Sequence, residues 1–154
     1  MAVLSEEQSM LRDAAKSWVQ EKSPVTAFRK MRDSGAELGY DVAAWNEMAE
    51  MGWAGVIIPE EYGGSNFGYL SLGLVLEELG RTLTASPLLA SGLAAASALI
   101  LGGNEAQKST WLPKIAEGTA VGALAVDEGA HHAPDKVAAT VKGGKLNGKK
   151  TFVL

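Results

Sequence analysis

Apolar residues recur at helical spacing through most of the chain before residue 119 and predict five helices. Two helix starts are marked by capping boxes, because Ser5 is followed by Gln8 and Asn104 by Gln107, three residues further on. Glycines stand where the helical pattern stops, which is typical of helix ends. Pro113 lies inside the last pattern and predicts a kink or an early break there. The helices are expected over residues 5–21, 41–52, 67–79, 86–101 and 104–118.

The pattern changes to that of strands after the fifth helix. Residues 120–126 form an apolar run, residues 136–141 alternate between apolar and polar, and Asn147-Gly148 between two extended segments predicts a hairpin. The chain stops at Leu154 within an expected strand, and a sheet needs about three strands to be stable alone. We therefore expect a further domain or a partner to complete the sheet. The fold class is mainly α, a bundle of about five helices followed by the opening strands of a β-domain.

The composition is that of a globular protein with a substantial core. Hydrophobic residues make up 47% of the 154 positions and charged residues 21%, near the average of folded domains. A chain of this length can bury about 68–70% of its unfolded surface. The four tryptophans are therefore expected to be mostly buried, namely Trp18, Trp45, Trp53 and Trp111.

The net charge and the content of particular residue types limit which partners and which cellular location are expected for the chain. The net charge is −4, and the Lys and Arg residues are scattered rather than gathered on one face, so no nucleic-acid partner is expected. Because the chain has no cysteine, it has no disulfide, thiolate nucleophile or zinc–sulfur site. The N-terminal segment carries two acids and no basic region, so a cytoplasmic location is expected. Residues 82–103 are nearly uncharged, but their Ser, Thr, Gly and Pro residues favour a buried helix over a membrane span.

Four stretches of the sequence resemble the acyl-CoA dehydrogenases in order and spacing, and the resemblance covers essentially the whole chain. The stretches are MAEMGWAGVIIPEEYGG, LVLEELGRT, NEAQKSTWLPKIAEGTAVGALAVDE and KLNGKKTFV. One short motif is a weak signal, but four in register over about 100 residues are hard to produce by chance. The resemblance implies an N-terminal helical domain over residues 1–119 and the incomplete start of a middle β-domain over residues 120–154. The C-terminal helical bundle of the family has no counterpart in this sequence.

The resemblance also implies a reaction. The family removes the proton α to the carbonyl of an acyl-CoA thioester while the β-hydrogen leaves as hydride to FAD. The base is a glutamate of the C-terminal bundle, so no catalytic residue is assigned here and the chain alone is expected to be inactive. The implied partners are an acyl-CoA substrate, an electron-transfer flavoprotein or similar acceptor, and further subunits of a homo- or hetero-oligomer. The implied role is fatty-acid or sterol side-chain degradation.

The resemblance places two stretches at the flavin. In the first stretch, which includes Val126, the family typically has a Thr-Glu-Pro turn followed shortly by Gly-Ser-Asp. Backbone amides and the Thr and Ser hydroxyls of these motifs hold the flavin ring edge and the pyrophosphate. Asp127 of this chain falls on the Thr of that turn. In the second, Phe152 matches an aromatic residue beside the flavin, and Leu154 matches a Thr or Ser that reaches N5. An ionised carboxylate donates no hydrogen bond and repels an electron-rich ring edge or a phosphate. We therefore expect weaker flavin binding than is usual for the family.

The resemblance places the helix expected over residues 86–101 beside the acyl tail of the substrate. Its candidate substrate-binding residues are Ala90, Leu93, Ala94 and Ala98, and the three alanines share one face because they recur every four residues. Small side chains there would leave room for a wide, even polycyclic, acyl group. The alternative, at least as well supported, is that small residues let two helices pack closely, since alanine is also the best helix former.

Other titratable residues have simpler explanations. The adjacent acids at 60–61 and 77–78 are expected in a solvated loop and on a solvated or salt-bridged helix face. His131 and His132 lack the further ligands of a tetrahedral metal site, so no metal is expected and a solvated loop is favoured. Three classes of function stay open. They are a catalytic acyl-CoA dehydrogenase, a non-catalytic subunit that supports an active paralogue in a mixed oligomer, and a helical interaction module without chemistry.

Overall fold

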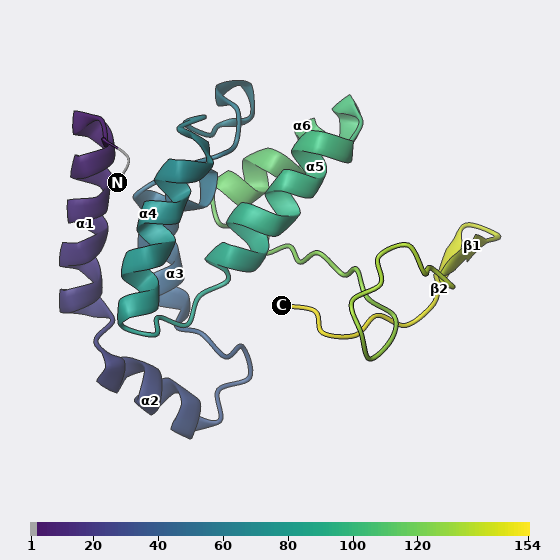
Figure 1. Ribbon diagram of the computed structural model, residues 1–154, viewed down its shortest axis with the longest axis horizontal. Coiled ribbons are helices and arrows are strands. Elements are labelled where there is room, and N and C mark those ends of the chain that lie inside the picture. Colours follow the sequence, from purple (N-terminus) through teal and green to yellow (C-terminus); the bar gives the residue numbers. More distant parts are fainter. Residues whose placement is uncertain (1–2) are drawn as a thin grey trace. The chain divides into compact units, whose positions relative to one another are not determined.

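The computed structural model describes residues 3–154, which form two compact units. The first unit ends at Gly122 and holds the helices, and the second runs from Ala123 to Leu154 and holds two strands (Figure 1). The expected fold class, a mainly helical part followed by strands, is confirmed. Within residues 3–154, every helix is too short or too polar to cross a membrane.

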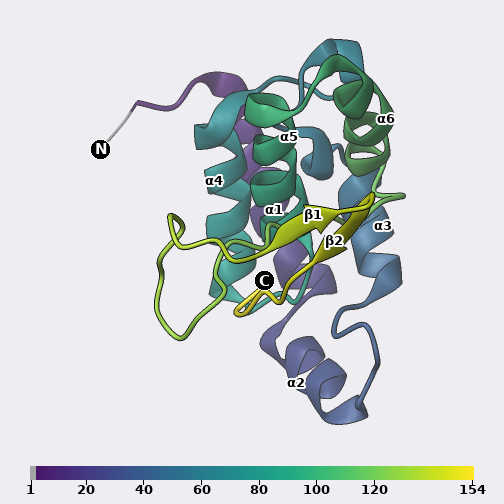
Figure 2. The same cartoon turned by 90° about the vertical axis from the view of Figure 1, so that its right-hand side faces the viewer.

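The helical unit is built from paired helices. Helices α1 and α4 pack side by side, and so do α5 and α6, as Figures 1 and 2 show. The α-helices are α1 (Glu6–Lys22), α2 (Val25–Ser34), α3 (Val42–Glu50), α4 (Gly68–Arg81), α5 (Ala96–Gly102) and α6 (Glu105–Ala116). The other helical segments are the 3-10 turns η1 (Trp53–Gly55) and η2 (Glu60–Tyr62) and the π-helix η3 (Leu88–Ala95).

The two capping boxes expected from the sequence are confirmed. Ser5 and Asn104 both make capping boxes, in which their side-chain oxygens accept the backbone N–H of Gln8 at 3.2 Å and of Gln107 at 2.9 Å. The Asp41 side chain likewise accepts two backbone N–H groups at the start of α3. Each cap satisfies amides that have no partner inside the helix, which is why these short-range signals locate the helices well.

Three helical features differ from the expectation. Helix α6 continues past Pro113, so the expected early break is wrong; the flanking Leu112 and Ile115 are buried and hold that turn against the core. The helix expected over residues 86–101 is present, but its first half, η3, has the wider π-helical turn. Helix α2 was not among the five expected helices. None of its residues is fully buried, so its sequence has no buried apolar face that would have indicated a helix.

Three of the four tryptophans form the core of the helical unit, as expected. Trp18, Trp45 and Trp53 are each less than 10% exposed, and the rings of Trp18 and Trp53 meet edge to face with centroids 5.5 Å apart. Trp111 is 48% exposed, so the expectation that it is buried is wrong. Helix α6 turns its aliphatic residues inward instead, and the Trp111 ring lies 5.1 Å from the Lys114 ammonium, a cation–π contact at the surface.

A folded-back loop connects η1 to α4. Backbone hydrogen bonds of 2.7 to 3.1 Å run from the amides of residues 65–67 to carbonyls of residues 55–58. Gly64 packs directly on Ile58, so closely that a Cβ at Gly64 would lie 2.0 Å from the Ile58 carbonyl oxygen. The apolar run before Pro59 is therefore buried by a chain reversal that only glycine fits.

The same loop is tied to α6. Tyr62 donates its hydroxyl hydrogen to Oε1 of Glu105 at 2.7 Å, and this hydrogen bond raises the pKa of Tyr62 to about 12. Glu60 and Glu61 are exposed, as expected for solvated acids. The tether links the start of α6 to the turn η2.

The second unit carries one short antiparallel hairpin. Strands β1 (Thr140–Lys142) and β2 (Lys145–Asn147) pair across Gly143-Gly144, whose φ angles are 58° and 72°. The expected turn at Asn147-Gly148 is therefore wrong. A two-residue hairpin loop needs positive φ at both central positions, and a pair of glycines supplies it without a steric cost. The apolar run 120–126 forms no strand in the structure.

Candidate functional site

The two stretches assigned to the flavin lie side by side in the second unit. The Thr151 N–H donates to the Asp127 carbonyl at 2.8 Å, and the Thr151 hydroxyl donates to the Gly129 carbonyl at 3.0 Å. The Lys150 ammonium donates to the Val126 carbonyl at 3.0 Å. Main-chain carbonyls of residues 126–129 thus bind residues 150–151, so stretches more than 20 positions apart in sequence build one surface.

The carboxylate of Asp127 is turned toward its own loop. Its Oδ1 accepts the Ala133 backbone N–H at 3.0 Å, and its Oδ2 lies 3.1 Å from Nδ1 of His132. The hydrogen bonds from His132 and then from Ala133 hold the pKa of Asp127 below its usual range. His132 is exposed, as expected, and is also paired with this carboxylate. Asp127 is therefore an ionised acceptor at the position where the resemblance leads to a hydroxyl donor.

The carboxylate of the neighbouring Glu128 has a different set of partners. Its carboxylate accepts the Lys150 ammonium at 2.8 Å and the backbone N–H groups of Ala138 at 2.6 Å and Ala139 at 3.1 Å. The Lys150 hydrogen bond is the main cause that lowers the pKa of Glu128. Glu128 thus joins three segments and has a structural task.

The remaining flavin candidates follow at the end of the chain. Phe152 is 76% exposed and has a positive φ of 52°, and Leu154 is 80% exposed. Both side chains lie at the surface of the second unit, one and three residues after Thr151. An exposed aromatic ring directly after Thr151 in the sequence suits stacking on a planar ring system.

The substrate candidates of η3 and α5 occupy a partly open face. Ala90, Leu93 and Ala94 are half-buried and Ala98 is exposed. The described hollows of the helical unit, about 240 to 930 Å³ in volume, are lined by other residues. An acyl-binding space beside Ala94 or Ala98 stays a prediction.

Close packing of η3 uses a different set of small residues. The Ser91 hydroxyl, fully buried, accepts the Gly122 N–H at 3.1 Å. A Cβ at Gly92 would lie 3.3 Å from the Ala54 carbonyl oxygen, and a Cβ at Gly122 would lie 2.7 Å from the Ala95 Cβ. The face formed by residues 91, 92 and 95 therefore makes the tight contacts, and residues 90, 94 and 98 are not needed for them.

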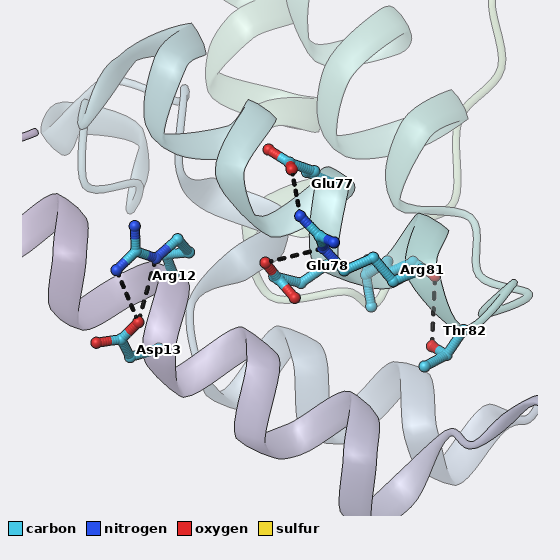
Figure 3. A network of polar contacts seen from close by, with 7 residues as sticks. Arg12, Asp13, Glu77, Glu78, Arg81 and Thr82 are labelled. Carbon is cyan, nitrogen blue, oxygen red and sulfur yellow. Dashed lines mark hydrogen bonds and ion pairs between the residues drawn. The ribbon is translucent and has the colours of Figure 1, made fainter. Parts of the chain in front are cut away.

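A separate network of charges lies on α4. Arg81 binds Oε1 of Glu77 at 2.6 Å and Oε1 of Glu78 at 3.3 Å (Figure 3). On the neighbouring helix α1, Arg12 pairs with Asp13. Glu78 is only 5% exposed, so the salt-bridged alternative holds for it and the solvated one is wrong. Because Arg81 pairs with both acids, Glu77 and Glu78 form a structural ion-pair network, and neither is a candidate for a catalytic carboxylate.

Comparisons with known proteins identify the helical part. The family model "Acyl-CoA dehydrogenase, N-terminal domain" matches residues 5–119. Among curated relatives, mitochondrial isovaleryl-CoA dehydrogenase of Pongo abelii is 36% identical over 157 residues, covering 97% of this chain and 37% of the relative. Acyl-CoA dehydrogenase IpdE2 of Mycobacterium tuberculosis is 37% identical over 123 residues, covering 79% of this chain and 37% of the relative. The chain thus spans 37% of the length of either relative.

Solved structures agree with this match. A steroid ACAD, Tcur3481-Tcur3483, is 29% identical with a TM-score of 0.84, over 96% of this chain and 41% of the other. The ChsE4-ChsE5 complex of Mycobacterium tuberculosis is 26% identical with a TM-score of 0.79, over 95% and 39%. Glutaryl-coenzyme A dehydrogenase in complex with glutaryl-CoA is 28% identical with a TM-score of 0.80, over 99% and 40%. This chain belongs to the acyl-CoA dehydrogenase family and contains its N-terminal domain.

Proposed function

We propose that this chain is the N-terminal portion of a flavin-dependent acyl-CoA dehydrogenase that introduces a double bond between the α and β carbons of an acyl-CoA thioester. The match of the N-terminal domain over residues 5–119 carries the proposal. In it, residues 1–119 form the helical domain and residues 120–154 begin the middle β-domain. No residue of this chain is assigned as the base that removes the α-proton.

The candidate residues fit FAD unequally. Phe152 offers an exposed aromatic ring, and the backbone N–H of Leu154 is a donor two residues further on. Asp127 does not fit a position that should donate a hydrogen bond, because its carboxylate is an acceptor already bound to Ala133 and His132. Bound FAD would supply the acceptor for the β-hydride, and the residues of this chain would bind and orient it.

The test is reduction of bound flavin by substrate. We expect the full-length protein, purified with any subunit that accompanies it, to lose its visible flavin absorption when an acyl-CoA is added without oxygen. Residues 1–154 alone should show no turnover with an artificial electron acceptor, because proton abstraction needs a base within hydrogen-bond reach. Turnover by residues 1–154, or a full-length protein whose flavin no acyl-CoA reduces, would contradict the proposal.

The carboxylate at Asp127 also favours a second candidate function, that of a non-catalytic subunit. A non-catalytic subunit that supports an active paralogue can tolerate the acceptor at Asp127 and the loss of a hydroxyl at Leu154. One structural neighbour, the ChsE4-ChsE5 complex, joins two differently named proteins. Under this proposal the full-length chain co-purifies with a second family member, and flavin is retained only by the mixed oligomer. An electron-transfer flavoprotein or similar protein would take the electrons.

The substrate proposal places a wide acyl group, such as a steroid, beside Ala94. Ala94→Leu in the full-length enzyme should lower kcat/KM about tenfold for a polycyclic acyl-CoA and spare a short-chain one, because the added side chain fills the space. Steady-state kinetics with both substrates measures the difference. Ala95→Leu is the matched control, since Ala95 packs against Gly122 and overpacking there should cost about 1–3 kcal/mol of stability and affect all substrates alike. Equal losses with both substrates for Ala94→Leu would favour packing instead.

A further inference from the structure

The loop from Asp127 to Ala133 closes around one of its own carboxylates. A backbone N–H and an imidazole converge on that carboxylate, from Ala133 at 3.0 Å and from His132 at 3.1 Å. The Asp127 side chain is 17% exposed although the loop is at the surface. Thr151 fixes the Asp127 carbonyl from the other stretch. A backbone amide and an imidazole that converge on one point in this way are donors of the kind that proteins use to bind anionic ligands.

We infer that the Asp127 carboxylate is an internal substitute for an anionic ligand, and that it takes the donors at residues 132–133 that a phosphate of a dinucleotide would otherwise use. The inference rests on the proposed function for the identity of that ligand as FAD. The loop is thereby ordered without any ligand. A phosphate reaching the same donors has to displace a carboxylate of like charge, which opposes its binding.

The neighbouring acids do not share this role. The Glu128 carboxylate is held by Lys150 and by the amides of Ala138 and Ala139, and it accepts no hydrogen bond from the donors at residues 132–133. Asp135 is exposed and makes no ion pair within the described residues, although it carries the same charge only two positions after Ala133. Asp127 is therefore the acid whose removal frees the donors of this loop, and Asp135 provides a control for charge alone.

The test compares Asp127→Ser with Asp135→Asn in the full-length protein after removal of flavin. Each change removes one negative charge, but only Asp127→Ser frees the Ala133 amide and His132. We expect Asp127→Ser to bind FAD at least about tenfold more tightly by fluorescence titration, since a hydrogen bond to a charged group contributes about that factor or more. Hydrogen exchange of the Ala133 amide without ligand should be at least about tenfold faster, because this amide loses its acceptor. Asp135→Asn should leave exchange unchanged and FAD affinity within about twofold.

Asp127→Asn keeps an acceptor oxygen for the Ala133 amide and serves if the serine variant does not fold. Its FAD affinity should lie between those of the wild type and Asp127→Ser. Unchanged or weaker FAD binding in both Asp127 variants, or unchanged exchange, would overturn the inference. If acyl-CoA does not reduce the wild-type flavin but the Asp127 variants still gain affinity, only the proposed reaction fails. If acyl-CoA reduces the flavin and the affinity does not move, only the inference fails.

Discussion

Trp53→Ala is expected to lower the free energy of unfolding of the chain by about 3–5 kcal/mol. Trp53 is 2% exposed and its ring meets the edge of Trp18 with centroids 5.5 Å apart, so truncation leaves a cavity between η1 and α1. Domains are stabilised by only about 5–15 kcal/mol in total. The variant should therefore unfold at a much lower urea concentration when its far-ultraviolet circular dichroism is followed.

The matched control is Trp111→Ala, which removes the same side chain from the surface of α6. Trp111 is 48% exposed and makes a cation–π contact with Lys114, so its truncation should cost about 1 kcal/mol or less. Comparing the two variants separates the effect of burial on stability from the effect of losing a tryptophan side chain as such. Equal losses for the two variants would mean that Trp53 is not buried in the core in solution.

The parts of the fold that follow from local chemistry were predictable from the sequence. A capping box needs only four consecutive residues, so Ser5 and Asn104 located α1 and α6 correctly. The Asp41 side chain caps α3 in the same way, within the helix expected over residues 41–52. Such signals are reliable because the cap and the amides that it satisfies lie within one turn of each other.

Other features depend on what lies across the molecule. Whether Trp111 or Leu112 faces the core depends on how α6 packs, and its two neighbouring apolar residues are equally compatible with helical spacing. Two glycine-containing pairs could each form the hairpin turn, and the sequence offered Asn147-Gly148 while the structure uses Gly143-Gly144. Pairing of the flanking strands decides between them, and that information is not local.

The candidate site divides in the same way. The resemblance assigned two stretches to the flavin, and the structure brings residues 126–129 beside residues 150–151. From the sequence, the resemblance indicated only that Asp127 cannot donate a hydrogen bond. The partners of its carboxylate, Ala133 and His132, come from the shape of a loop that differs from the family pattern in sequence. In the sequence, Asp127 stands only as the loss of a hydroxyl donor. In the structure, its carboxylate is the acceptor that closes the loop.

The loop between η1 and α4 gives the second large effect. Gly64→Ala should destabilise the chain by about 3 kcal/mol, at the upper end of the usual range for overpacking. The new Cβ would lie 2.0 Å from the Ile58 carbonyl oxygen and 2.5 Å from its carbonyl carbon, and both belong to backbone that cannot rotate away. Relief requires residues 65–67 to move, which breaks their hydrogen bonds to residues 55–58.

Gly73→Ala provides the control for this substitution. A Cβ at Gly73, on the exposed side of α4, meets nothing within 4 Å, so alanine there should stabilise the chain by about 0.5–1 kcal/mol through its better helix propensity. The same chemical change should thus have opposite signs at two positions nine residues apart. Urea unfolding of both variants measures it, and a neutral Gly64→Ala would show that the chain reversal is looser than its contacts indicate. Because Gly64 closes the loop over the buried Ile58, the expected loss also explains why an apolar run, a proline and two glycines occur together at this point of the sequence.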